Sequence, residues 1–177
     1  MDSFLVLVPC SRPMRTVLAL LVILCGSTSI AMSASPTDSV DVRLDAHRWE
    51  HRLLFVFAPS ETHDALQAQM SALAEASEGL RDRDMRLFTI VAEGTSRRRT
   101  VASAPGQPIT AAAVRRLRNR FDVPLDAVRV ILVGKDGTEK RREAEPVSVR
   151  ALFDQIDAMP MRQREMRRDS TGRNGEP

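Results

Sequence analysis

Aromatic residues and cysteine are scarce in this sequence of 177 residues. It has no tyrosine, a single tryptophan, Trp49, and two cysteines, Cys10 and Cys25, which both lie near its beginning. Nucleic-acid-binding surfaces concentrate basic residues, and single-strand binders add aromatic side chains on which bases stack. Here 26 lysine and arginine residues stand against 23 acidic ones, mostly mixed along the chain. We therefore expect no nucleic-acid partner.

Residues 1–34 have the composition of a signal peptide. Arg12 and Arg15 precede an apolar run over residues 17–24, and small residues follow that run. The run is far shorter than the roughly 20 residues of a membrane-spanning helix, so we expect no stable membrane span. Cleavage after Ala31 or Ala34 would produce a periplasmic or secreted protein.

Cleavage of this segment would also remove both cysteines. The mature chain would then have no disulfide, no thiolate nucleophile and no sulfur ligand for a metal. Two alternatives stay open in this part of the sequence. The true start codon is either Met1 or Met14. Cys25 resembles a lipoprotein acylation site, although Leu24 stands where that site requires a small residue.

Apolar runs and helical periodicity follow a polar spacer over residues 35–42. Short apolar runs predict three strands, over residues 52–58, 85–92 and 127–133, and the tight turn Gly134–Gly137 predicts a short fourth strand over residues 138–142. Apolar residues at helical spacing predict three helices, one from Asp64 to about residue 84, one capped by Thr110 and ended by Val123-Pro124, and one after Pro146. The glycines and prolines of residues 93–108 predict a loop or a mobile hairpin, and residues 161–177 a polar, disordered tail.

The order of these elements is strand, helix, strand, helix, strand, strand, helix. A right-handed parallel unit followed by an antiparallel hairpin and a closing helix forms a central four-stranded mixed sheet with helices on both faces. We therefore predict one α/β, thioredoxin-like domain over residues 43–160.

Several short motifs between about Leu44 and Arg167 carry a family resemblance. They are His47-Arg48-Trp49, Phe57-Ala58-Pro59, Arg83-Asp84, Leu132–Gly137 and Leu152-Phe153, together with Ile156–Arg162. With these motifs the chain resembles the bacterial family called domain of unknown function 4174, which is similar to the repeated domain of some vertebrate secreted matrix proteins. The resemblance implies a thioredoxin-like or peroxiredoxin-like fold without an established activity.

The thioredoxin redox site has no counterpart in the mature chain. Thioredoxins place Cys-x-x-Cys between the first central strand and its helix, where this chain has Ser60-Glu61-Thr62-His63-Asp64. The proline that precedes their third central strand is replaced by Ala127-Val128. We therefore expect no thiol oxidoreductase activity.

The segment from Ser60 to Asp64, which we call the mouth, is one candidate binding site. It lies at a predicted helix N-terminus, where free N–H groups and the helix dipole favour anions. Ser60, Thr62 and His63 are its candidate contact residues. We favour the alternative that Ser60, Thr62 and Asp64 only cap the helix, with Gln67 as the partner of the Asp64 cap.

Lys135, Asp157 and Arg162 are the other candidate binding residues. Lys135 lies in a glycine-flanked turn, where turn chemistry explains the neighbouring residues without a ligand. Asp157 and Arg162 belong to the Ile156–Arg162 motif, for which two interpretations stay open. Its methionines and arginines dock a partner, or the motif is structural, with its methionine in the core, its proline ending the helix and its aspartate paired with an arginine.

The histidines indicate no metal site and no catalytic triad. His47 and His51 are four residues apart with Glu50 between them, but no third ligand is evident, so we expect no metal and no cofactor. Trp49 and Arg48 are expected to cover the edge of the core, with the indole N–H satisfied.

The sequence therefore predicts a non-enzymatic binding or interaction module with a periplasmic or extracellular protein as partner. The alternative is an enzyme with unrecognised, non-thiol chemistry at the mouth. No catalytic residue is assigned.

Overall fold

β1 (Arg52–Ser60) runs through the middle of a six-stranded mixed sheet in the computed structural model, which describes residues 41–99 and 106–173. It pairs in parallel with β2 (Met85–Glu93) and antiparallel with β5 (Arg129–Val133), which in turn pairs with the edge strand β6 (Glu139–Glu143). These are the four predicted central strands, and the prediction of a mixed sheet is confirmed.

The sheet has two short strands beyond the predicted four. β3 (Arg97–Arg99) and β4 (Gln107–Pro108) extend it beyond β2, in the order β4-β3-β2-β1-β5-β6. They form antiparallel pairs from the segment that was predicted as a loop or hairpin. Three consecutive arginines have no apolar alternation, so the sequence pattern indicates no strand there; backbone pairing with β2 forms it.

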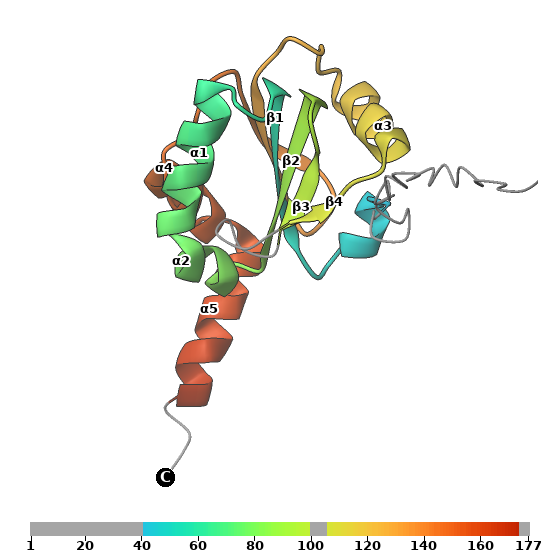
Figure 1. Cartoon of the computed structure of the whole chain (residues 1–177). Coiled ribbons are helices and arrows are strands. Elements are labelled where there is room, and N and C mark those ends of the chain that lie inside the picture. Colours follow the sequence, from blue (N-terminus) through green and yellow to red (C-terminus); the bar gives the residue numbers. More distant parts are fainter. Residues whose placement is uncertain (1–40, 100–105, 174–177) are drawn as a thin grey trace, which may run out of the picture. The chain divides into compact units, whose positions relative to one another are not determined.

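Three helices cover one face of the sheet and a fourth covers the other (Figure 1). The first group comprises α1 (Asp64–Glu75), α2 (Ser77–Asp82) and α4 (Val149–Asp157), while α3 (Ala111–Phe121) lies on the opposite face. The long helix predicted from Asp64 is therefore two helices, interrupted at Ala76. Thr110 caps α3 as predicted, because its Oγ1 accepts a hydrogen bond from the N–H of Ala113 at 3.2 Å.

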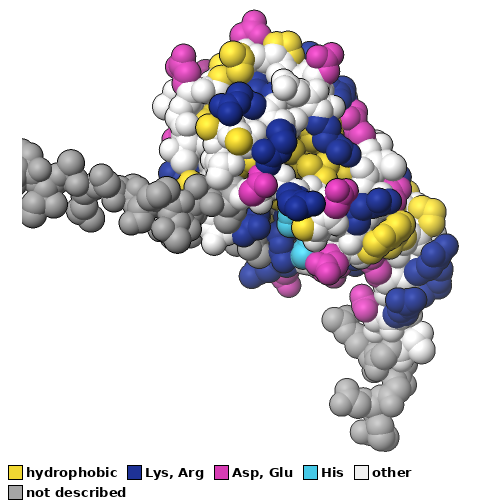
Figure 2. Space-filling model, turned by 90° about the vertical axis from the view of Figure 1, so that its right-hand side faces the viewer, with side chains coloured by type: hydrophobic (Ala, Val, Ile, Leu, Met, Phe, Trp, Pro, Cys, Tyr) yellow, Lys and Arg dark blue, Asp and Glu magenta, His cyan; other side chains and the backbone are white. Residues whose placement is uncertain are grey.

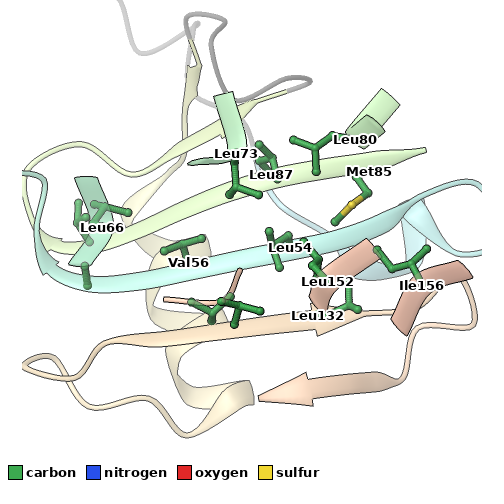
Figure 3. Packing of buried hydrophobic residues seen from close by; sticks show 14 residues of the cluster. Leu54, Val56, Leu66, Leu73, Leu80, Met85, Leu87, Leu132, Leu152 and Ile156 are labelled. Carbon is green, nitrogen blue, oxygen red and sulfur yellow. The ribbon is translucent and has the colours of Figure 1, made fainter. Parts of the chain in front are cut away.

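β1 supplies the core on both faces of the sheet. Leu54 and Val56 pack with α1, α2 and α4, as Figure 3 shows. Phe55, between them, points to the α3 side, where its ring lies 4.8 Å from that of Phe88 and 5.2 Å from that of Phe121. A strand that is buried on both faces needs apolar residues at successive positions, and the sequence has such a continuous apolar run here.

Residues 160–173 form a helix, α5 (Pro160–Arg173), so the predicted disordered tail is wrong over this part. Pro160 begins α5 instead of ending the helix before it, which suits a residue with a fixed φ and no N–H. Figure 1 shows α5 leaving the α/β layers near the end of the sheet where β1 begins. Val42, from the predicted spacer, is 5% exposed and packs in the core on the α3 side of the sheet.

The predicted signal peptide, with Cys10 and Cys25, lies outside the described residues, as do residues 35–40 of the spacer and 174–177 of the tail. In the described part of the chain no helix has the length and apolarity needed to cross a membrane.

Candidate functional site

The mouth connects β1 to α1, as predicted, but the cap of α1 is His63. Its Nδ1 accepts a hydrogen bond from the N–H of Ala65 at 3.3 Å. The predicted cap, Asp64, is the first helical residue, and Gln67 donates to the carbonyl oxygen of Glu61 at 2.5 Å. The N-cap position of α1 therefore lies one residue before the predicted one, and a histidine occupies it.

Ser60 and Thr62, the other two candidate residues of the mouth, have their hydroxyl oxygens 3.3 Å apart. They bond to each other and not to the helix N-terminus, so the predicted capping by these two residues is also wrong. Thr62 is exposed and Ser60 is half-buried. The segment remains accessible, with the hydroxyls of Ser60 and Thr62 bonded to each other.

A buried arginine that sequence reasoning missed lies behind the mouth. Arg118 of α3 is 4% exposed, and its Nη2 donates to the carbonyl oxygens of Ala58 at 2.8 Å and Ile90 at 3.2 Å. Its Nη1 donates to the carbonyl oxygen of Pro124 at 2.6 Å. Burial lowers the pKa of Arg118. One signal was available, since position 118 follows Leu117 on the apolar stripe of the helix.

Lys135 lies at the opposite end of the sheet from the mouth, in the turn from β5 to β6. Its side chain is 8% exposed, and its Nζ donates to Asp84 Oδ2 at 2.7 Å and to Glu165 Oε1 at 2.8 Å. Its ammonium is therefore held between two carboxylates and is not a free surface charge.

Asp157 and Arg162 are also engaged in internal contacts. Arg83 donates to Asp157 Oδ2 at 2.5 Å, and Arg162 donates to Asp157 Oδ1 at 3.4 Å. Arg162 is 4% exposed and donates to both the side chain and, at 2.8 Å, the carbonyl oxygen of Asp82. The predicted pairing of the motif's aspartate with an arginine is confirmed.

These contacts belong to one set of eight side chains, which we call the charge network. Its members are Arg52, Arg83, Lys135 and Arg162 with Asp82, Asp84, Asp157 and Glu165. Arg52, 1% exposed, donates to Glu165 Oε2 at 3.1 Å and thereby links β1 to α5. Burial alone would raise the pKa of Glu165, but the hydrogen bond from Lys135 and the charge of Arg52 lower it below its ordinary value.

A pocket of 260 Å³ opens beside the charge network. We call it the junction pocket, because it lies between the β5–β6 turn and the junction of α4 with α5. Its lining residues are Arg52, Gly134, Lys135, Asp136, Lys140, Met159, Pro160 and Met161. The structure thus brings together the turn and the Ile156–Arg162 motif, which the sequence had suggested as separate contact candidates, and leaves the mouth at the far end of β1.

Trp49 is exposed beside the same turn, so the prediction that it covers the core edge is wrong. Its side chain is 61% exposed, and its backbone has a φ of 68°. A hydrogen bond of 2.7 Å from its N–H to the carbonyl oxygen of Lys135 holds this conformation. A left-handed backbone is uncommon for a bulky residue and often marks a functional position.

Within the described part of the chain, the charges around Trp49 are only partly paired. The Arg48 guanidinium lies 5.5 Å from the centre of the Trp49 ring, and among residues 41–99 and 106–173 no carboxylate forms a salt bridge with it. Lys140, in contrast, pairs with Asp136 at 2.7 Å. Figure 2 shows basic and acidic side chains interleaved over the face that carries the histidines.

His47 and His51 come together as their spacing suggested, with ring centroids 5.6 Å apart. Within the described ranges no cluster of three potential metal ligands occurs. Burial lowers the pKa of both imidazoles, and the charges of His51, Arg98 and Arg86 lower that of His47 further. Both rings therefore favour the neutral form in the folded protein.

We expect the protein to lose stability as the pH falls below about 6.5, the ordinary histidine pKa. Above that pH both imidazoles are neutral in the folded and in the unfolded protein, and the protein has its full stability. Below it, the unfolded chain takes up protons that the folded imidazoles accept only at lower pH. Urea unfolding across this range should show the decline, and His47→Gln with His51→Gln should flatten it. An equally steep decline in the double variant would contradict the assignment.

Comparison with known proteins agrees with this fold. The model of the family described as "Domain of unknown function (DUF4174)" matches residues 43–165. Coiled-coil domain-containing protein 80 of Danio rerio is 30% identical over 138 residues, which are 72% of this chain and 16% of that protein. Human sushi repeat-containing protein SRPX is 33% identical over 124 residues, which are 70% of this chain and 26% of that protein. The chain thus spans a small part of the relatives it matches.

Two solved structures show the same fold at low identity. Reduced 2-Cys peroxiredoxin of Plasmodium vivax superposes with a TM-score of 0.51 at 14% identity, covering 70% of this chain and 85% of that one. Thioredoxin peroxidase I of Plasmodium yoelii also has a TM-score of 0.51, at 16% identity, covering 70% and 80%. The fold is thioredoxin-like or peroxiredoxin-like, with a mixed six-stranded sheet and helices on both faces.

Proposed function

This chain belongs to the family of domains of unknown function 4174, and on that premise we propose that it is an exported, non-enzymatic binding module for a protein partner. Its contact surface, which we call the Trp49 surface, comprises Arg48, Trp49 and the junction pocket. The observation that carries the proposal is the exposed indole of Trp49 on a constrained backbone.

The composition of the Trp49 surface suits protein recognition. Tryptophan and arginine are enriched among the residues that dominate binding energy at interfaces. Met159 and Met161 in the adjoining pocket offer flexible, polarizable contacts that adapt to a partner's side chains. The charge network beneath the pocket holds α5 against β1, so the surface is presented on a rigid support.

The chemistry of the surface also indicates what the partner presents. Trp49 and the methionines favour an apolar side chain, and Arg48 has no carboxylate partner among the described residues. A protein segment that carries an acidic residue next to an apolar one would satisfy both. Export rests on the leader composition of residues 1–34, and the absence of cysteine from residues 35–177 leaves thiol chemistry without a nucleophile.

Replacing Trp49 with alanine is expected to lower capture of the partner about tenfold or more, as the loss of a dominant interface residue does. The measurement is in-cell crosslinking of the tagged protein, with quantitative mass spectrometry of its crosslinked partners and of its own N-terminus. A chain beginning at Met32 or Ser35 would report export and cleavage.

Leu125→Ala is the matched control, because Leu125 is also a large exposed apolar residue, at 66%, but precedes β5 at the mouth end of the sheet. It should leave the yield within about twofold, a change well below that of an interface anchor. Equal losses in the two variants, or no loss in Trp49→Ala, would overturn the proposal.

A further inference from the structure

A second pocket, of 260 Å³, lies on the α1 face of the sheet, away from the Trp49 surface. We call it the α1–β3 pocket. Among the described residues it is lined by Glu61, Leu66, Gln67, Met70, Thr89, Val91, Thr95, Arg97 and Arg99. Its volume equals that of about nine water molecules at about 30 Å³ each, which is enough for a small organic molecule.

Two arginines enter this pocket from one strand. Arg97 pairs with Thr89 and Arg99 with Leu87, whereas Arg98 between them pairs with Phe88. Because side chains alternate along a strand, Arg97 and Arg99 point to the α1 face and Arg98 to the opposite face. The charge of Arg98 accordingly acts on His47, which packs against Phe88 with ring centroids 5.8 Å apart.

The charges inside the pocket do not cancel. Burial lowers the pKa of Arg99, and the charge of Arg97 lowers it further, while Glu61 opposes both. The Glu61 carboxylate accepts a hydrogen bond from the N–H of Thr95. Arg97 donates to the carbonyl oxygen of Gly106 at 3.3 Å, and within the described ranges no carboxylate forms a salt bridge with it. Among the described lining residues, the formal charges of Arg97, Arg99 and Glu61 sum to +1.

Apolar side chains form part of the pocket lining. Leu66 and Val91 are 3% and 2% exposed, and Met70 is half-buried against the same core. A ligand that fits these walls has one anionic group for the arginines and a short apolar chain for the leucine and methionine. Partly buried arginines bind carboxylates well, because their planar fork of donors matches the two oxygens.

We propose that the α1–β3 pocket binds a small aliphatic carboxylic acid, with its carboxylate on Arg97 and its chain against Leu66 and Met70. This site goes beyond the protein-binding role of the Trp49 surface and shares no lining residue with it. Loss of one function therefore leaves the other measurable.

The test is an NMR titration of the isotope-labelled protein with hexanoate, in the form that the cell exports and processes. Saturable shifts are expected at the amides of Leu66, Met70 and Val91. Hexanol, which has the same chain length without the charge, should bind at least about tenfold more weakly, since it lacks the charge-assisted bond.

Arg97→Gln should weaken hexanoate binding about tenfold or more, while Arg98→Gln should leave it within about twofold. The two variants remove the same charge from adjacent positions of one strand, on opposite faces. A thermal unfolding curve for each variant shows whether it is folded at the titration temperature. If Arg97→Gln is not folded, Arg97→Lys, which lacks the planar fork of donors, is titrated in its place.

Three results would overturn the proposal. They are the absence of saturable shifts at the pocket, equal weakening by Arg97→Gln and Arg98→Gln, and equal affinity for hexanol and hexanoate. The second would indicate unspecific attraction to positive charge, and the third an apolar cavity without an anion site.

Discussion

Replacing Arg52 with alanine is expected to lower the free energy of unfolding by about 3–5 kcal/mol. Arg52 is 1% exposed, and its guanidinium donates to the Arg83 carbonyl oxygen at 2.9 Å as well as to Glu165. The variant leaves a carboxylate and a carbonyl without this donor, and also loses the packing of a long side chain. Urea unfolding measures the loss.

The same variant should also release α5 from the sheet. Because Glu165 connects α5 to β1 through Arg52, trypsin should cleave within α5 faster in Arg52→Ala than in the unchanged protein. Arg150→Ala is the control, since Arg150 is 92% exposed and lies 3.7 Å from Asp154. It should change the free energy of unfolding by less than about 0.5 kcal/mol. Similar losses in both variants would contradict the anchoring role of Arg52.

Replacing Arg118 with alanine is expected to lower the free energy of unfolding by roughly 3 kcal/mol, because each hydrogen bond to a charged group contributes about 1.5–3 kcal/mol. Its donors serve three carbonyl oxygens, two of which belong to β1 and β2. Without Arg118, the carbonyl oxygens of Ala58 and Ile90 on the two parallel strands lose the buried donor that they share. Chemical unfolding followed by circular dichroism measures the change.

Two further variants separate geometry from charge at this position. Arg118→Lys keeps the charge but lacks the planar fork, so it should lose an intermediate amount of stability. Arg115→Ala changes an exposed arginine of the same helix and should shift the free energy of unfolding by less than about 0.5 kcal/mol. A fully stable Arg118→Ala variant would show that the three hydrogen bonds contribute nothing net.

The central fold could be predicted because its strands and helices carry strong periodic signals. The run from Leu53 to Ala58 is apolar on both faces, and Thr110 stands at a typical capping position. β3 and α5 were missed because neither has an apolar pattern. β3 is three arginines held by pairing with β2, and α5 is a polar helix held through Arg162 and Glu165.

The candidate residues were found only in part, because burial decides the role of a charged side chain and the sequence does not show it. Lys135 and Arg162 were candidate contact residues, but each is less than 10% exposed and bonded within the charge network. Trp49 was expected to cover the edge of the core, but its side chain is 61% exposed on a backbone with a positive φ. The turn and the final motif nevertheless lie side by side, since both line the junction pocket.

The most direct test of the proposed binding role places a photo-crosslinking amino acid at one position of the protein in living cells. We predict a discrete protein adduct when it replaces Glu50, which is exposed directly after Trp49, and none when it replaces Thr62, which is exposed at the mouth on the opposite end of β1. An adduct formed at Thr62 and not at Glu50 would contradict the Trp49 surface and move the binding site to the mouth.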